Sequence, residues 1–336
     1  MMRLEKENLY PILFTPIYKE IIWGGDMMQS HLGRTLPKTT LPIGEAWEIV
    51  DRPDSQSIVE NGPLKGKTIR ELIETYGSSL VGEKYAAKLF PLLVKIIDAG
   101  QRLSLQVHPD EATCKKLKGA EPKTEMWYII AAKKDAKIFV GLNHKATKGS
   151  FLNTCQSVEV EKYLQASKSV AGDAYFISAG TVHAIGEGNL LFEVQQNSET
   201  TFRISDWGRI GADGKPRELH MEKALESIHF IQRSSSKVSG VTGGTAHNRK
   251  FPIIQYCPFF KVDDLRLTGK WDDTTMHNGS GVFHIITAVN NSIKIQKDSV
   301  ITEVPMGRSA LVPASFGQYS ILADETAEST VLKTLA

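Results

Sequence analysis

The chain has 336 residues, which is enough for one large domain and a smaller one. It carries 40 Lys and Arg against 38 Asp and Glu, so it lacks the basic excess of a nucleic-acid-binding protein. No stretch approaches the roughly 20 apolar residues of a membrane-spanning helix, and the first ten residues lack the apolar core of a secretion signal. We therefore expect a cytoplasmic protein without a nucleic-acid or membrane partner.

Short strand-like segments bounded by turn residues dominate the first two thirds of the chain. They are predicted at 90–98, 103–107, 126–132, 137–140, 174–178, 190–195 and 201–204. Helical patterns are confined to insertions at about 66–85, 111–118, 158–168 and 218–230. Because strands and helices do not alternate, we exclude a Rossmann-type sheet and predict an antiparallel barrel or sandwich.

A polar segment rich in Ser, Gly and Thr separates two parts of the sequence. We predict a catalytic domain over 1–235, a linker over 236–250 and a smaller β domain over 251–336. Strands of the smaller domain are predicted at 251–256, 281–288, 292–297, 309–312 and 320–322. This domain contains His277 and His284 but no acid at ligand spacing, so we expect it to hold no metal.

Two segments carry residue types that bind metals. In LSLQVHPDE, Gln106 and His108 are two residues apart on a predicted strand, so both side chains point to the same face. Taken alone, the pair is equally well explained as polar residues on a solvent-facing strand. Downstream, the segment from Gly172 to His183 predicts a turn, a strand, a second turn and a histidine at the start of the next strand. A barrel would direct His183 inward.

The spacing of these residues resembles the two motifs of the cupin superfamily. The second motif, G-x5-P-x-G-x2-H, is matched by Gly172 to His183, with Ser178 in place of the proline and no Asn three residues after His183. The first motif, His-x-His followed by Glu, is matched if Gln106 replaces the first histidine and Glu125 follows a helical insertion.

Six ordered segments extend this resemblance over essentially the whole chain. They are FTPIYKEIIWGG (14–25), IGEAWEI (43–49), FPLLVKIIDAGQRLSLQVHPDE (90–111), KTEMWYII (123–130), SAGTVHAIG (178–186) and FEVQQNSETTFRISDW (192–207). Together they are similar to the short bacterial form of type I mannose-6-phosphate isomerases, also called phosphomannose isomerases. The resemblance implies a mainly β fold of two cupin-like, jelly-roll barrels with a few helical insertions. It also implies one Zn²⁺ per chain, bound by Gln106, His108, Glu125 and His183.

The implied reaction interconverts mannose 6-phosphate and fructose 6-phosphate through a cis-enediol, with the metal stabilising charge on the reacting oxygens. The resemblance assigns Arg203 to the active site. Glu193 is the leading candidate for the catalytic base, with Lys123 or metal-bound water as alternatives. The residues expected to bind the phosphate of the sugar are Ser104, Lys95, Lys123 and Arg203. Lys95 lies in an apolar strand, where an unpaired buried ammonium would be costly.

Two other functions are compatible with parts of this pattern. His108, Glu125 and His183 would also form the facial triad of a mononuclear iron oxygenase, although Gln106 as a fourth ligand argues against it. A non-catalytic sugar-binding cupin is the second alternative, and the retained polar residues disfavour it. Trp47 is interpreted as a packing residue. The sequence leaves open whether the protein is a monomer or a homodimer.

Overall fold

The computed structural model describes residues 9–155, 157–211, 214–230, 237–238 and 248–336. The described residues form two compact units. We call residues 18–47 and 94–238 the site unit, and residues 9–17, 48–93 and 248–336 the C-terminal unit. These units differ from the predicted domain limits, since 9–17 and 48–93 group with the C-terminal strands. Most of the predicted linker at 236–250 lies outside the described residues.

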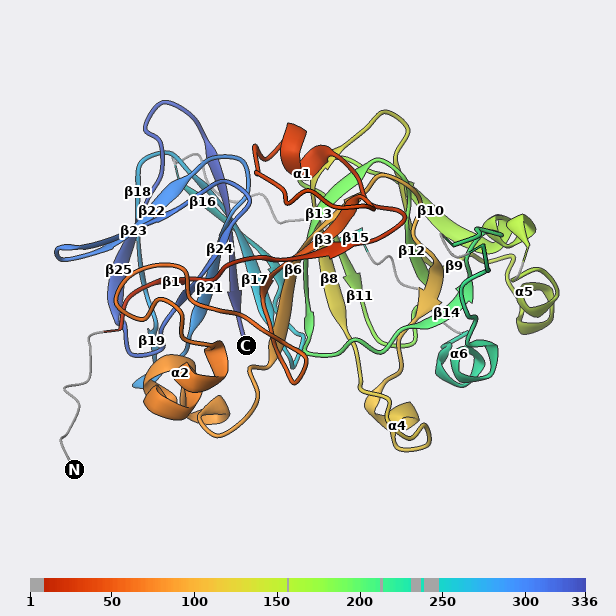
Figure 1. Cartoon of the computed structure of the whole chain (residues 1–336), viewed down its shortest axis with the longest axis horizontal. Helices are drawn as coiled ribbons and strands as arrows, with labels where there is room; N and C mark the ends of the chain where they lie inside the picture. Colours follow the sequence, from red (N-terminus) through yellow and green to blue (C-terminus); the bar gives the residue numbers. More distant parts are fainter. Residues whose placement is uncertain (1–8, 156, 212–213, 231–236, 239–247) are drawn as a thin grey trace. The chain divides into compact units, whose positions relative to one another are not determined.

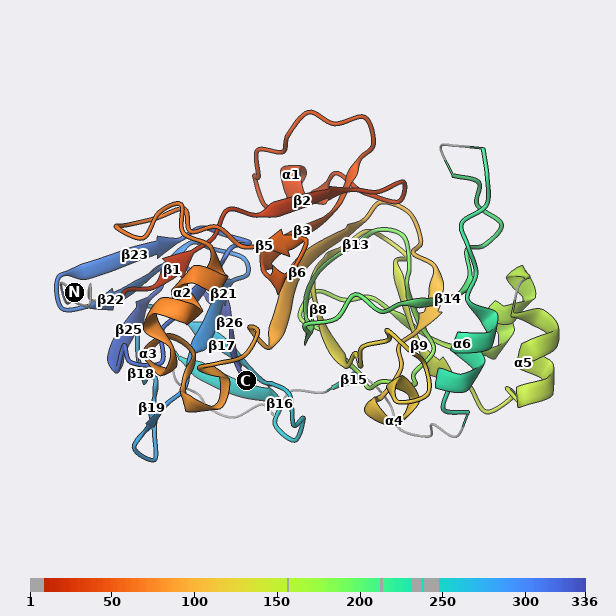
Figure 2. The same ribbon diagram turned by 60° about the horizontal axis from the view of Figure 1, so that its bottom comes forward.

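The site unit consists of two facing antiparallel sheets (Figures 1 and 2). The larger sheet contains, in spatial order, β15 (Lys237–Val238), β11 (Ala174–Ile177), β8 (Glu125–Ala132), β13 (Asn189–Gln196), β6 (Leu92–Ala99), β3 (Ile43–Ile49) and β2 (Ile17–Glu20). The smaller sheet contains β10 (Leu164–Lys168), β9 (Lys137–Leu142), β12 (His183–Ile185), β7 (Leu105–Val107) and β14 (Phe202–Ser205). The apolar residues that alternate toward the space between the sheets form the core of this unit.

Two helices cover the outer face of the smaller sheet. Figure 1 shows α5 (Lys148–Thr154) and α6 (Met221–Ser227) outside β9, β12 and β14, where Phe151 and Ala224 join one apolar cluster with outward residues of these strands. The short helices α1 (Met27–Ser30) and α4 (Glu111–Cys114) complete the described helices of this unit, with a 3-10 helix at Val158–Tyr163. Neither α1 nor α5 was expected from the sequence.

The helix predicted at 158–168 is wrong beyond Tyr163. Residues Leu164–Lys168 form β10, an edge strand that pairs with β9 in antiparallel register. The local pattern of charged and apolar residues suits a helix, but the hydrogen bonds offered by the edge of β9 decide the conformation.

The C-terminal unit is also a sandwich of two antiparallel sheets. One contains β1 (Ile12–Leu13), β24 (Ser309–Val312), β21 (His284–Ala288), β26 (Ser329–Leu335), β17 (Lys261–Leu267) and β16 (Arg249–Ile254). The other contains β18 (Lys270–Thr274), β25 (Gln318–Leu322), β22 (Ile293–Lys297) and β23 (Val300–Val304). The remaining short strands are β4 (Asp51–Arg52), β5 (Ser55–Gln56), β19 (Met276–His277) and β20 (Ser280–Gly281).

Segments from the start of the chain complete the C-terminal unit (Figure 1). Strand β1 pairs with β24, and Arg308 next to β24 binds the buried carboxylate of Glu48 at 3.0 Å. The helices α2 (Ile69–Tyr76) and α3 (Ser78–Val81) and a 3-10 helix at Glu83–Tyr85 also belong here. Helix α2 begins at a capping box in which Thr68 and Glu71 satisfy each other's backbone N–H groups.

The prediction of a mainly β fold is confirmed, and the strands predicted in the site unit are present with their ends shifted by a few residues. Strands β17, β18, β23 and β26 were not predicted. Within the described residues, no helix combines the length and apolar character needed to cross a bilayer.

Candidate metal centre and active site

The interior of the site unit changes from apolar to polar toward one end of its strands. Its apolar cluster includes Ile97, Trp127, Ile129, Ile185 and Leu191. Residues two apart on a strand share a face, so the next inward positions are Lys95, Glu125, His183 and Glu193, and all four are buried. Charged side chains buried in this way need partners or a function.

Three buried side chains at this end meet around one point. The ligand atoms of His108, Glu125 and His183 all lie within 4.8 Å of one another. Nε2 of His108 is 3.4 Å from Oε2 of Glu125, and Nε2 of His183 is 3.5 Å from Oε1. That Oε1 atom is buried without a hydrogen-bond partner. Two imidazoles and a carboxylate suit Zn²⁺ and related divalent ions, so the residues present fit a metal.

Backbone carbonyls fix the orientation of both imidazoles. Nδ1 of His108 lies 2.8 Å from the carbonyl oxygen of Thr200, and Nδ1 of His183 lies 2.8 Å from that of Thr181. Because a carbonyl only accepts hydrogen bonds, each Nδ1 carries the proton, and each Nε2 presents its lone pair toward Glu125. This is the tautomer that binds a metal through Nε2.

Charges around Glu125 keep these groups in their ligand forms. Burial alone would raise the pKa of Glu125, but the charge of Lys123, whose Nζ donates to Oε2 at 2.5 Å, holds that pKa well below its usual value. Burial and then the charge of Lys123 lower the pKa of His108 to about 3. Burial also lowers the pKa of His183. The carboxylate is therefore ionised and both imidazoles are neutral at neutral pH.

Gln106 lies at the centre of a row that crosses the smaller sheet. It is the cross-strand partner of His183 on β12 and of Arg203 on β14. Its Nε2 lies 3.2 Å from Nε2 of His183, and Ser104 Oγ donates to its Oε1 at 3.5 Å. The amide nitrogen therefore faces His183, and metal binding through the oxygen needs a half-turn of the amide group.

Arg203 is half-buried and retains hydrogen-bonding capacity. Its Nη1 donates to the carbonyl oxygen of Glu218 at 2.7 Å, whereas its buried Nε has no partner. Burial and then the charge of Arg217 lower the pKa of Arg203. Since an arginine is charged at any working pH, this side chain can receive an anionic group.

Lys95 lies between two carboxylates. Its Nζ is 3.3 Å from Oε2 of Glu45 and 3.5 Å from Oε1 of Glu193. Although burial opposes the charge, these two carboxylates raise the pKa of Lys95 above its usual value. Burial and the charge of Glu125 raise the pKa of Glu193. Two carboxylates thus compensate the buried charge of Lys95.

Glu45, Trp47 and Trp127 belong to this network and were not expected there. Trp47 Nε1 donates to Glu45 at 2.6 Å, and Trp127 Nε1 donates to Glu193 at 2.8 Å. The ring of Trp47 also lies 5.3 Å from Nζ of Lys95, so its interpretation as a packing residue alone was incomplete. Glu45 and Trp47 are two apart on β3, a period-two signal like that of Gln106 and His108, but their link to Lys95 depends on β3 lying beside β6.

Comparisons of the sequence and of the structure with known proteins find mannose-6-phosphate isomerases as relatives. A family model described as phosphomannose isomerase type I, catalytic domain, matches residues 12–153. The mannose-6-phosphate isomerase ManA of Bacillus subtilis is 43% identical over 317 residues, covering 93% of this chain and 95% of that protein. A probable mannose-6-phosphate isomerase of the same organism, GmuF, is 32% identical over 316 residues, covering 93% and 96%. A crystal structure of the mannose 6-phosphate isomerase from Bacillus subtilis has a TM-score of 0.84 at 29% identity, covering 97% of this chain and 99% of that one.

The two-sheet fold and the buried cluster of His108, Glu125 and His183 define a cupin enzyme with a candidate metal-binding site. With a relative at 43% identity over nearly its whole length, the chain belongs to the type I phosphomannose isomerase family and is an isomerase. The predictions of family, fold class and enzyme class are confirmed.

The buried ion triad yields a stability prediction. Changing Lys95→Met leaves Glu45 and Glu193 facing each other without a cation, and we expect the free energy of unfolding to fall by about 3–5 kcal/mol. Adding Glu45→Gln should restore part of this loss, because one of the two like charges is removed. Urea unfolding measures both changes, with Lys294→Met on an exposed face as the control. Equal stability of the Lys95→Met and Lys294→Met variants would contradict the network.

Proposed function

We propose that this protein interconverts mannose 6-phosphate and fructose 6-phosphate through a cis-enediol, using one Zn²⁺ held by His108, Glu125, His183 and Gln106. The observation that carries the proposal is the convergence of His108, Glu125 and His183 within 4.8 Å, in a chain 43% identical to a mannose-6-phosphate isomerase. A bound divalent ion supplies Lewis-acid stabilisation of the negative charge that develops on the sugar oxygens. The donor set favours zinc over the harder Mg²⁺.

Glu193 is proposed as the group that moves the proton between the first two carbons of the sugar. A base works best when its pKa lies near working pH, and burial together with the charge of Glu125 raises the pKa of Glu193 in that direction. Lys95 and the indole N–H of Trp127 hold the carboxylate in one position. Lys123, at 3.0 Å from His108 Nε2, is the second candidate for proton transfer and a hydrogen-bond donor to the substrate.

Arg203 is proposed as the main contact of the substrate phosphate, with Ser104 beside it. The predicted phosphate lysines, Lys95 and Lys123, are already engaged by carboxylates in the structure. Arg203 instead retains the partnerless Nε, and its planar guanidinium group can bind phosphate through paired hydrogen bonds. The two lysines then contribute positive charge to the site without direct contact with the phosphate group.

The two alternative functions are not favoured. Neither an iron oxygenase nor a non-catalytic sugar-binding cupin accounts for the similarity to mannose-6-phosphate isomerases over more than nine tenths of the chain. The cytoplasmic location stays a prediction.

Removal and return of the metal test the reaction and the ion together. Protein stripped with a chelator should lose isomerase activity toward mannose 6-phosphate and regain it with Zn²⁺, because the developing charge needs a Lewis acid. The Arg203→Ala variant should keep one metal per chain while its kcat/KM falls by about 10²-fold or more. Metal analysis measures the metal content of each protein, and a coupled assay measures its isomerase activity. Full activity in the stripped protein, or loss of metal from the Arg203→Ala variant, would overturn these assignments.

A pH profile tests Glu193 as the base. Trp127→Phe keeps an aromatic side chain but removes the indole N–H that donates to Glu193 at 2.8 Å. Since that bond favours the ionised form, its loss should raise the pKa of Glu193. A base must be ionised to act, so the acid limb of the kcat/KM profile should move to higher pH.

Trp207→Phe is the matched control for this shift, because Trp207 Nε1 donates instead to the carbonyl oxygen of Leu103 at 2.7 Å. Its acid limb should stay in place. An unmoved or lowered limb in the Trp127→Phe variant would exclude Glu193 as the group that sets it.

A further inference from the structure

The interior of the C-terminal unit also changes from apolar to polar at one end. Its apolar core includes Leu265, Ile286, Ile321 and Val331, with Trp271 packed against it. The inward positions two residues from these are Asp263 on β17, His284 on β21, Tyr319 on β25, Lys333 on β26 and Asp273 on β18. Three neighbouring strands of one sheet and two of the other thus carry a polar group at this end of the interior.

Hydrogen bonds and ion pairs join these residues across the two sheets. Lys333 is the cross-strand partner of Asp263, and its Nζ lies 2.7 Å from Oδ2 of Asp273 in the opposite sheet. Tyr319 is the cross-strand partner of Asp273, and its hydroxyl lies 2.7 Å from Nδ1 of His284. His284 is completely buried, and the side chains of Lys333 and Asp273 are 6% and 10% exposed.

Such a network is costly for a unit that needs only a stable core. Well-packed apolar residues in place of a buried ion pair are often equally or more stable, and the rest of this interior is apolar. Retained buried charges beside a cavity are typical of binding sites. The polar end therefore calls for a function that the apolar core does not explain.

A cavity of about 440 Å³ opens at this end. Lys333 and Asp263 form part of its wall, together with His277, whose Nε2 lies 3.2 Å from Nε2 of His284. Apolar groups, including Pro258 and Phe259, complete the lining. A pocket of this size holds a small metabolite.

Four lysines give this cavity its electrostatic character. Besides Lys333, they are Lys84, Lys250 and Lys261. Lys250 pairs with Asp263 at 2.8 Å and Lys333 with Asp273. Within the part of the chain that the structure describes, neither Lys84 nor Lys261 lies within ion-pair distance of a carboxylate. Two exposed lysines without an ion-pair partner thus lie in the lining of this cavity, and their charge attracts a dianion.

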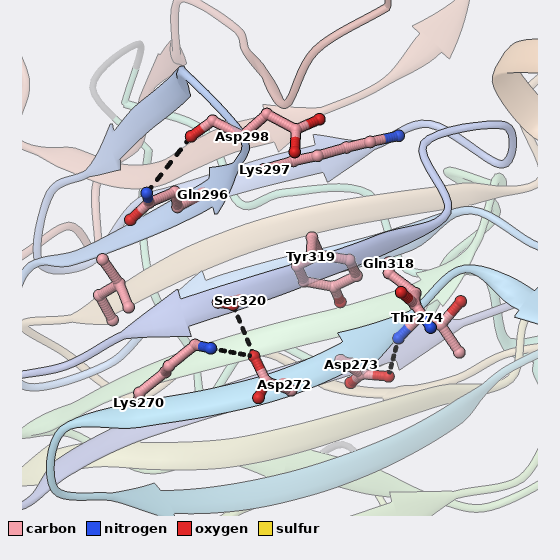
Figure 3. Close-up of a pocket in the computed structure, with 11 residues that line it drawn as sticks. Lys270, Asp272, Asp273, Thr274, Gln296, Lys297, Asp298, Gln318, Tyr319 and Ser320 are labelled. Carbon is pink, nitrogen blue, oxygen red and sulfur yellow. Dashed lines mark hydrogen bonds and ion pairs between the residues drawn. The ribbon is translucent and has the colours of Figure 1, made fainter.

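A larger hollow of about 890 Å³ on the same unit has a different character (Figure 3). Its exposed groups pair with each other: Asp272 binds Lys270 at 3.0 Å and Ser320 at 2.6 Å, as the dashed lines in Figure 3 show. The lining of this hollow has no excess of lysines over acids, and we interpret it as a solvated face of the sheet.

We propose that the 440 Å³ cavity of the C-terminal unit binds the phosphate group of a small metabolite, with Lys84 and Lys261 as the main contacts. Lysines bind phosphate as point charges, and the buried network behind them holds Lys333 and His277 at the cavity wall. The apolar lining accommodates the uncharged part of a phosphate monoester. This site is separate from the metal cluster and goes beyond the proposed isomerase activity.

Direct binding in the zinc-loaded full chain tests the site. The Arg203→Ala variant serves as background, because it removes the phosphate contact proposed for the catalytic site. Calorimetric titration with inorganic phosphate and with glycerol 3-phosphate should show one binding event per chain. Adding Lys84→Ala and Lys261→Ala should weaken it by about tenfold. Tighter binding of glycerol 3-phosphate than of inorganic phosphate identifies a monoester site, and the reverse identifies a site for the free ion.

Lys294→Ala, a change of one exposed lysine on β22, is the matched control and should leave the affinity within about twofold. Because Lys84 and Lys261 are exposed, both sets of variants should share one unfolding midpoint, and Lys84→Gln with Lys261→Gln provides a second test that keeps hydrogen-bonding side chains. No binding of either probe at millimolar concentration, or an affinity unchanged by both double variants, would overturn the proposal. Isomerase activity does not enter this test.

Discussion

One buried carboxylate organises the site unit. Glu125 is fully buried in the interior of the sandwich, where an isolated charge would be far too costly. Two imidazoles with their lone pairs turned inward and the ammonium of Lys123 surround it. The same two imidazoles and carboxylate can bind a divalent ion. The contacts that stabilise the buried charge of Glu125 are therefore also the ones on which the proposed chemistry depends.

The rest of the site follows from strand alternation around this carboxylate. Trp127 is two residues beyond Glu125 on β8, and it is the cross-strand partner of Glu193. Glu193 contacts Lys95 on β6, which contacts Glu45 on β3. These contacts pass from β8 to β13, β6 and β3 in turn, and Lys95 and Glu193 face inward because Ile97 and Leu191, two residues away on the same strands, are apolar core residues. A polar network of Trp127, Glu193, Lys95 and Glu45 therefore extends from the metal-type cluster across the larger sheet.

Alternation explains which parts of this arrangement were predictable. Gln106 lies on β7 and His108 directly follows this strand, and a turn, a strand and a second turn precede His183, so local sequence was enough to bring these residue types to the site. The partners of Lys95 were not predictable in this way, because Glu45 reaches it only through the pairing of β3 with β6. The same limit applies to β1, which pairs with β24 almost 300 residues later, and to β10, whose conformation depends on the edge of β9. Long-range pairing leaves no local signal in the sequence.

Both units place polar residues at one end of an otherwise apolar interior, but with different chemistry. The site unit presents imidazoles and a carboxylate, which favour a cation. The C-terminal unit presents lysines, which favour an anion. Anomalous diffraction at the zinc edge from crystals of the zinc-loaded protein tests the metal centre of the site unit most directly. We expect one peak per chain, at about 2.0–2.2 Å from Nε2 of both His108 and His183 and from a carboxylate oxygen of Glu125. A peak elsewhere, or none at this cluster, would contradict the account.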